Sequence, residues 1–388
     1  MKYNFDETVT RRGTSSIKWD AADTDDILPM WIADMDFKTF PPLSVVLARI
    51  ASQGHFGYNT VPDRFYDAII LWWLKRHKCN IQKDWIVPST GVVAGISAVI
   101  TTLAHQGDEI IIQTPAYNHF FNVIEGCRCK PVENNLIYED GVYRIDYEDL
   151  ELKASSAKAK VLLLCNPHNP VGRVWTDKEL NTMALICAKH NVYVVSDEIH
   201  SDLILTKRPH STFISAANDQ NIPAIIISSA SKTFNLSGLH AAFIFADDHD
   251  LHKRIQKQLW AKGCGTPGLM ACEALIVCYT QGDEWLMELN HYLSENYRFL
   301  RAFIDSHLST IRVLPLEATY LVWLNCEATG IKSKELSKIL LEKEKLWLNA
   351  GDMYGSSGQG FLRINIACPR EILHEGLVRL KSSLEKFL

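Results

Sequence analysis

Five short apolar runs in the middle of the chain constrain the fold more than any other feature. Each is five or six residues long and rich in Ile and Val, which is typical of strands buried on both faces of a parallel sheet. The runs are Glu109–Thr114, Lys160–Cys165, Val192–Ser196, Ala224–Ser229 and Ala242–Ala246. Helical apolar spacing occurs between and before them, at Phe65–His77, Val93–His105 and Asp177–His190. This alternation predicts an α/β fold with right-handed crossovers.

The C-terminal third has a different pattern. A long helix is expected at Glu284–His307, followed by mixed strands and a terminal amphipathic helix, which together indicate a smaller α+β unit. The expected strands are Tyr320–Leu324 and Phe361–Ile366, and the expected terminal helix is Glu371–Phe387. We therefore expect a large domain over residues 46–285, with a mostly parallel central sheet flanked by helices. A smaller unit would combine residues 286–388 with an N-terminal arm of residues 1–45.

Composition excludes several classes of protein. The 388 residues carry a formal net charge of −5, which argues against a nucleic-acid partner. No apolar run reaches the roughly 18 residues that a membrane span needs, and the polar N-terminus lacks a secretory signal. The ten cysteines form no Cys-x-x-Cys pair and the histidines show no ligand spacing, so we expect no metal site and a reduced, cytoplasmic setting.

Polar residues follow the predicted strands where each strand ends. Tyr117 follows the first strand, Asn166 and Asn169 follow the second, Asp197 follows the third and Lys232 follows the fourth. In open α/β sheets, ligands bind outside the carboxyl ends of the strands. Four segments should therefore direct these side chains toward one crevice. Upstream, Gly91 precedes a predicted helix, whose first N–H groups favour an anion such as a phosphate.

This set of side chains matches the needs of one cofactor. A pyridine ring with a phosphate, an aldehyde and a phenolic oxygen needs a lysine for its imine and a carboxylate for its ring nitrogen. It also needs a hydrogen-bond donor for the phenolic oxygen and an aromatic ring to stack on. Lys232, Asp197, Asn169 and Tyr117 supply these groups in that order. The sequence therefore predicts a pyridoxal 5'-phosphate site.

Several stretches also resemble a known family. Ser231–Leu239 (SKTFNLSGL) looks like the lysine segment of fold-type I pyridoxal-phosphate enzymes of the class I/II aminotransferase superfamily. Leu28–Phe37 (LPMWIADMDF), Asn166–Trp175 (NPHNPVGRVW) and Ser196–His200 (SDEIH) resemble the MalY/PatB branch of cystathionine β-lyases, which are carbon–sulfur lyases. The likeness follows the family's order along nearly the whole chain. It implies β-elimination on a sulfur amino acid, releasing a thiol, pyruvate and ammonia.

The resemblance also implies residue roles. Lys232 would bind the cofactor covalently and act as the catalytic base, Asp197 would pair with the ring nitrogen and Asn169 with the phenolic oxygen. Arg363 would hold the substrate carboxylate, and Tyr58 would reach into the partner subunit's site of a homodimer. The remaining implied cofactor contacts are Gly91, Val92, Val93, Tyr117, Ile199, His200, Ser229 and Ser231. Tyr117, Asn169 and Ala33 are also expected to contact substrate. For Trp31 and Asp34 the structural alternative is that they only shape the mouth of the site.

Two positions depart from the aminotransferase pattern. His200 stands where true aminotransferases usually carry a Tyr, which fits the lyase branch. His240 stands where they usually carry a basic residue for the phosphate, so the charge partner of the phosphate is open.

Structural alternatives remain for the site residues. Asp197 could be a helix N-cap, Asn166 and Asn169 could be turn residues, Tyr117 a core aromatic and Arg363 a surface arginine. At the level of function, an aminotransferase is the alternative enzyme. A regulator that binds a transcription factor and uses the cofactor only structurally is the alternative from another class.

Overall fold

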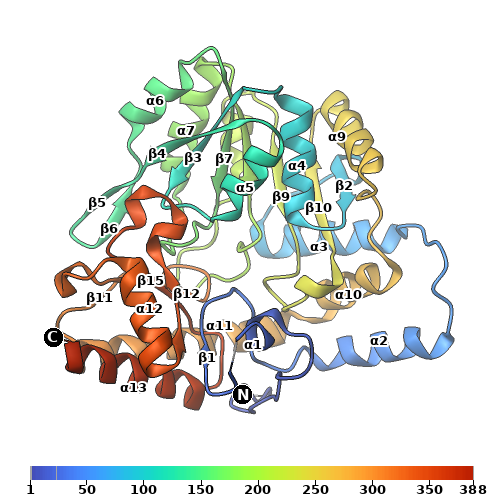
Figure 1. The fold of residues 1–388 in the computed structure, drawn as a ribbon. Coiled ribbons are helices and arrows are strands. Elements are labelled where there is room, and N and C mark those ends of the chain that lie inside the picture. The colour runs from blue at the N-terminus through green and yellow to red at the C-terminus, as the bar shows by residue number, and fades with distance from the viewer. Residues whose placement is uncertain (1, 23, 388) are drawn as a thin grey trace.

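A seven-stranded sheet forms the centre of the computed structural model, which describes residues 2–22 and 24–387 (Figure 1). The strand order is β2-β10-β9-β8-β7-β3-β4. The bounds are β2 (Ile86–Ser89), β3 (Glu109–Thr114), β4 (Lys130–Asn135), β7 (Ala159–Cys165), β8 (Tyr193–Asp197), β9 (Ile225–Ser228) and β10 (Ala242–Ala246). Every predicted strand of this sheet is present, and the predicted α/β fold with a mostly parallel sheet is confirmed.

One expectation about this sheet is corrected. β10 runs antiparallel to both of its neighbours, β2 and β9, whereas the other pairings are parallel. All five residues of the Ala242–Ala246 run are apolar, which predicts a strand of the parallel sheet. An apolar run buried on both faces shows burial, but it carries no information about strand direction.

Helices cover both faces of the sheet. One face packs on α4 (Val92–Leu103), α5 (His119–Gly126) and α9 (His249–Ala261). The other packs on α3 (Asp63–His77), α6 (Tyr147–Ala154), α7 (Asp177–Lys189), α8 (Phe213–Asp219) and α10 (Leu269–Gln281). Successive residues of β3 alternate between the two cores: Ile110 and Ile112 contact the first, and Ile111 the second. This two-sided burial explains the apolar runs of the sequence.

A smaller antiparallel sheet lies beside the large one, at the lower left of Figure 1. Its order is β11-β12-β15-β14, with bounds β11 (Arg312–Val313), β12 (Leu321–Asn325), β14 (Asn349–Ala350) and β15 (Phe361–Asn365). The accompanying helices are α11 (Asp283–His307), α12 (Ser333–Glu344) and α13 (Arg370–Phe387). Strands β5 (Ile137–Glu139) and β6 (Val142–Arg144) form a separate hairpin. Short 3₁₀ helices are η1 (Lys83–Trp85), η2 (Ser237–Leu239), η3 (Glu327–Thr329), η4 (Gly351–Tyr354) and η5 (Ser356–Gly358).

The N-terminal segment joins this smaller unit. β1 (Leu28–Pro29) pairs in parallel with β13 (Leu346–Trp347), and α1 (Ile17–Asp20) lies at the N-terminal end, near the bottom of Figure 1. α2 (Pro41–Gln53) then extends to the side of the molecule. The division into residues 46–285 and the remainder stays a prediction; its C-terminal boundary falls in the first turn of α11. Within the described residues, no helix is long and apolar enough to cross a membrane.

Candidate active site

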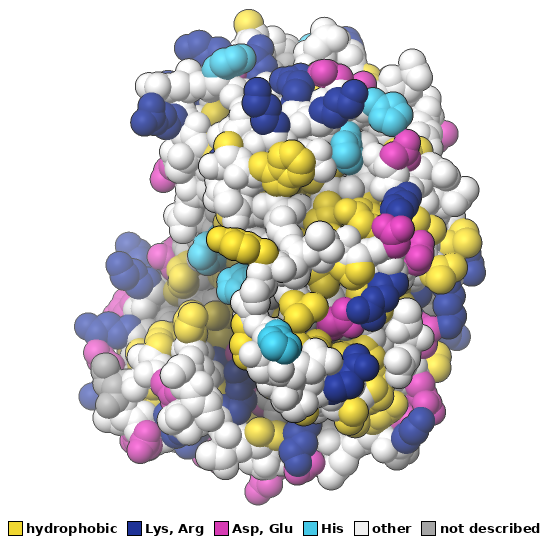
Figure 2. All heavy atoms as spheres, turned by 90° about the vertical axis from the view of Figure 1, so that its right-hand side faces the viewer, with side chains coloured by type: hydrophobic (Ala, Val, Ile, Leu, Met, Phe, Trp, Pro, Cys, Tyr) yellow, Lys and Arg dark blue, Asp and Glu magenta, His cyan; other side chains and the backbone are white. Residues whose placement is uncertain are grey.

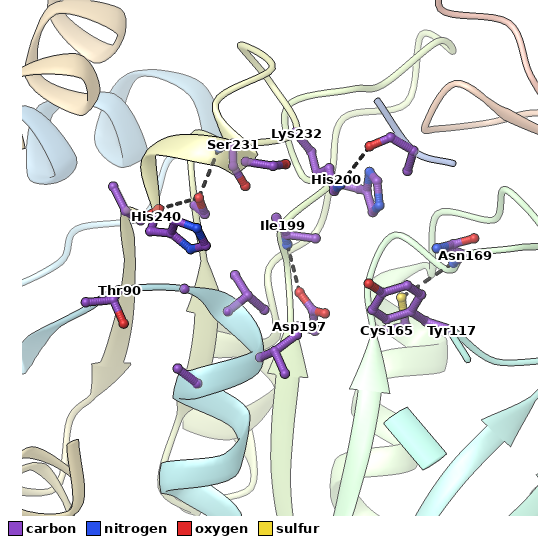
Figure 3. Close-up of a pocket in the computed structure, with 18 residues that line it drawn as sticks. Thr90, Tyr117, Cys165, Asn169, Asp197, Ile199, His200, Ser231, Lys232 and His240 are labelled. Atoms are coloured by element: carbon purple, nitrogen blue, oxygen red, sulfur yellow. Dashed lines mark hydrogen bonds between the residues drawn. The ribbon is translucent and has the colours of Figure 1, made fainter. Parts of the chain in front are cut away.

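A cavity of about 360 Å³ opens where β3, β7, β8 and β9 end and α4 begins (Figure 3). Of the predicted cofactor residues, all but Tyr58 line it. They are Gly91, Val92, Val93, Tyr117, Asn169, Asp197, Ile199, His200, Ser229, Ser231 and Lys232, and Ala33 lines it as well. The convergence of chain segments predicted from the strand ends is therefore present in the structure.

Lys232 enters the cavity from the loop after β9. Its Nζ donates a hydrogen bond of 2.8 Å to the carbonyl oxygen of Ala33. Burial lowers the pKa of Lys232 to about 8; Asp34 and Asp197 raise it, while Arg363 lowers it further. About a tenth of this amine is therefore neutral and nucleophilic at pH 7, and the fraction rises with pH.

Asp197 lies at the opposite side of the cavity, at the end of β8, and is 3% exposed. Its Oδ1 accepts a hydrogen bond of 3.1 Å from the backbone N–H of Ile199, and the described residues supply no other hydrogen bond to it. Burial raises the pKa of Asp197 to about 7. Among the described residues, Lys232 forms no ion pair with it within 4.0 Å, so the cavity separates the amine from the acid.

The N-terminus of α4 forms another wall. Gly91 is the N-cap residue and makes no side-chain cap, so the first N–H groups of α4 are available to a ligand. A Cβ added at Gly91 would meet no atom within 4 Å, which shows open space beside the helix start. Nearby, the Ser231 N–H donates to Ser229 Oγ, and Ser229 Oγ donates to the Ala241 carbonyl. The Ser229 hydroxyl thus already holds the loop that carries Lys232.

Arg363 enters from β15 and is 4% exposed. One terminal nitrogen donates to Asn169 Oδ1 at 3.0 Å and the other to the Trp31 carbonyl at 2.8 Å. Its Nε is buried without a partner, and no described carboxylate lies within 4.0 Å of the guanidinium. A buried guanidinium without an anion is costly, so this arginine is suited to bind an anionic group from solution. The surface alternative for Arg363 is wrong.

Tyr117 and His200 line the cavity without carrying a charge near neutral pH. Burial raises the pKa of Tyr117 to about 12, and its ring lies among the residues lining the cavity (Figure 3). Burial lowers the pKa of His200 to about 3, an effect that Lys232 and Arg363 strengthen. His200 Nδ1 has no partner in the described structure. A neutral His200 therefore adds no charge beside the lysine.

Two predicted residues lie elsewhere. Tyr58 is fully exposed on the loop between α2 and α3, away from the cavity. Asn166 is buried outside the cavity, where it donates to the Ser211 carbonyl, so its structural alternative fits. Thr90 and Cys165 also line the cavity and were not among the predicted site residues. Their signals were available, because Thr90 precedes Gly91 and Cys165 ends β7.

Comparison with known proteins places this architecture in a family. The model of the family described as "Aminotransferase class I and II" matches residues 33–380, and the chain belongs to that family. Cystathionine β-lyase PatB of Bacillus subtilis is 36% identical over 98% of this chain and 100% of its own length. Protein MalY of Escherichia coli is 32% identical over 98% and 99%. The structure of cystalysin from Treponema denticola, which contains pyridoxal 5'-phosphate, has a TM-score of 0.96 at 31% identity and covers 100% of both chains. The resemblance seen in the motifs is confirmed.

Proposed function

We propose that this chain is a pyridoxal-phosphate-dependent carbon–sulfur lyase of the cystathionine β-lyase type. Its reaction would be β-elimination on a sulfur amino acid, giving a thiol, pyruvate and ammonia. One observation carries the proposal: a partly neutral lysine and a buried carboxylate face each other across a cavity that begins at an uncapped helix N-terminus. The relatives support the same reaction class, because one is named a cystathionine β-lyase and another is named cystalysin.

The residues present fit the cofactor. When bound, pyridoxal 5'-phosphate supplies an aldehyde that bonds to amines and a ring that takes up the electrons of a carbanion. Lys232 Nζ would hold the aldehyde carbon, and Asp197 would keep the ring nitrogen protonated. The first N–H groups of α4 would bind the phosphate. A cationic ring nitrogen beside Asp197 would also remove the cost of burying this carboxylate, which now stands alone.

Lys232 would then act as the base. Its Nζ would take the α-proton of the substrate and later return a proton to the leaving group or solvent. The lowered pKa keeps this amine unprotonated for part of the time near neutral pH. The carbonyl of Ala33 would orient the amine, since it already accepts its hydrogen bond.

Arg363 would orient the substrate. Its guanidinium can bind the α-carboxylate, and the bond to Asn169 Oδ1 fixes the plane of the guanidinium relative to the cofactor site. Tyr117 would stack on one face of the ring and Ile199 would contact the other. This arrangement presents the α-proton toward Lys232.

We also propose a homodimer in which Tyr58 completes the partner subunit's site. Figure 2 shows hydrophobic side chains gathered over the middle of the face at the right of Figure 1. Phe56 and Tyr58 are 66% and 112% exposed on the loop at that edge, which supports contact with a second copy. Mixed dimers of Lys232→Ala and Tyr58→Ala subunits should regain activity that each variant lacks alone. A cytoplasmic location is supported by the ten free cysteines.

The test of the reaction is a product assay. The protein, loaded with the cofactor, is incubated with cystathionine in the absence of any keto acid. Equal amounts of thiol and pyruvate are expected, with none from Lys232→Ala and normal yields from Lys262→Ala, whose amine contacts Ser97 outside the cavity. Absence of thiol, together with amine transfer to 2-oxoglutarate, would identify an aminotransferase instead.

A further inference from the structure

A second cavity, of about 490 Å³, adjoins the first on the side of the N-terminal arm. Both cavities are lined by Ala33, Tyr117 and Lys232, so they are adjacent. In the proposed function the cofactor fills the first. The side chain of a bound substrate, beyond its sulfur atom, must therefore extend into the second.

An oppositely charged pair lines the second cavity. Arg11 donates from one terminal nitrogen to Asp34 Oδ2 at 2.8 Å, and the two side chains are 21% and 27% exposed. Asp34 Oδ1 and Arg11 Nε have no hydrogen-bond partner in the described parts of the chain. Each charge therefore keeps capacity to bind a ligand. Asp34 also raises the pKa of Lys232, which shows that its carboxylate lies close enough to act on the amine of the site.

Neighbouring contacts hold the Arg11–Asp34 pair in place without neutralising either of its charges. Asp36, which is 4% exposed, accepts 2.6 Å and 2.7 Å hydrogen bonds from Lys18 Nζ and Trp19 Nε1. Lys18 therefore already neutralises Asp36. The contact of Arg11 with Asp36 is longer, at 3.2 Å, and a further bond to the Met35 carbonyl fixes its orientation. Arg11 and Asp34 are left as a preorganised dipole at the cavity wall.

The lining of the second cavity also includes apolar surface. Trp31 lines the cavity and stacks on Trp347, with ring centroids 4.6 Å apart, so its position is fixed. Met353 also lines the cavity. Sulfur and methylene groups pack favourably on such aromatic and thioether surfaces.

From this geometry we propose that Arg11 and Asp34 form a subsite for the second amino-acid head of a dipolar thioether substrate. Arg11 would bind the distal carboxylate and Asp34 the distal ammonium, and the thioether chain would lie along Trp31. This subsite rests on the proposed function and would recognise the charged distal head of the substrate. The enzyme should therefore prefer cystathionine-like thioethers to cysteine derivatives with short or uncharged leaving groups.

The test compares cysteine thioethers that differ only at the distal end, using cofactor-loaded enzyme. The four are cystathionine, S-carboxyethylcysteine, S-aminoethylcysteine and S-propylcysteine. Arg11→Gln should lower the ratio of kcat/KM for S-carboxyethylcysteine to that for S-propylcysteine about tenfold. Asp34→Asn should lower the corresponding ratio for S-aminoethylcysteine about tenfold, and cystathionine should lose activity in both variants. Such ratios do not depend on the fraction of protein that folds.

Arg12→Gln is the matched control. Arg12 has similar exposure, 24%, and donates to the carbonyls of Trp19 and Ile27, but it lines neither cavity. Its substitution should leave every ratio unchanged. Equal losses for all four thioethers in Arg11→Gln would overturn the subsite and show that Arg11 only supports the arm. Ratios that do not move in either variant would overturn it too.

Failure of the lyase reaction is distinguishable from failure of the subsite. If the unaltered enzyme releases no thiol, the proposed function is wrong. The dissociation constants of the four thioethers can still be read from changes in cofactor absorbance. Arg11→Gln is then expected to weaken binding of S-carboxyethylcysteine relative to S-propylcysteine, and Asp34→Asn to weaken binding of S-aminoethylcysteine in the same way. If neither ratio of dissociation constants changes, the subsite is overturned.

Discussion

Two buried aspartates of the same loop region should respond in opposite ways to loss of their charge. Asp197 has a single hydrogen bond, from the Ile199 N–H, and burial raises its pKa to about 7. Asp202 accepts hydrogen bonds from Trp72, His77 and Thr233. Although burial opposes it, His77, Arg76 and Thr233 lower the pKa of Asp202. Asp202 is thus paired within the fold, whereas Asp197 has only the cofactor to pair with.

The effect of Asp197→Asn on the cofactor-free protein follows from that pKa. A rise from 3.8 to about 7 corresponds to roughly 4 kcal/mol between the protonated and charged forms. The folded state holds this proton more tightly than the unfolded chain, so stability falls as pH rises from about 4 to about 7. Asparagine can still accept from Ile199. The substitution should therefore stabilise the cofactor-free protein by about 2–4 kcal/mol near pH 8, and this gain should vanish near pH 4.

Urea unfolding of cofactor-free protein at several pH values and one protein concentration measures this effect. Asp202→Asn is the matched variant, and it should destabilise the protein by about 1–3 kcal/mol, because an amide cannot accept all the hydrogen bonds that the carboxylate receives from Trp72, His77 and Thr233. Added pyridoxal phosphate should stabilise the unaltered protein more than Asp197→Asn. An Asp197→Asn protein that is no more stable near pH 8, or whose gain is independent of pH, would refute the reasoning.

Three further outcomes are expected. The rate at which cofactor-free protein takes up pyridoxal phosphate should rise with pH, reach half its maximum near pH 8 and level off above about pH 9, because only the neutral Lys232 amine attacks an aldehyde; stopped-flow absorbance measures it, and a flat profile would contradict the lowered pKa. Arg363→Lys should raise KM at least about tenfold while the dissociation constant of the cofactor stays unchanged, since lysine cannot form the bidentate contact. His240→Arg should tighten cofactor binding severalfold in a fluorescence titration, because His240 lines the cavity near the α4 N-terminus; no change would leave the helix and hydroxyls as the phosphate site.

The sequence alone predicts which side chains meet in the site, because the position of each one relative to its strand can be read locally. Each polar residue follows a run of apolar residues, and parallel strands bring their carboxyl ends to one edge. This placed Tyr117, Asn169, Asp197 and Lys232 correctly in one cavity. The antiparallel direction of β10 was not predictable in the same way, because all of its residues are buried and none marks a direction.

The contacts that the N-terminal arm makes with the site could not be predicted from the sequence either. The contact between Lys232 and Ala33 uses a backbone carbonyl, which no residue type reveals. Lysine usually lies at the surface, and yet Lys18 is 1% exposed, because its pairing with Asp36 depends on how α1 packs against the segment after β1. Arg11 reaches the second cavity through the same packing. Such contacts require the tertiary structure.

Attachment of the cofactor to one lysine tests the central claim most directly. The protein is incubated with pyridoxal phosphate, reduced with borohydride, digested, and its peptides are mapped by mass spectrometry. The account predicts that the reduced cofactor is found on Lys232, and that Lys232→Ala protein carries none. Attachment to a different lysine, or no specific attachment, would contradict it.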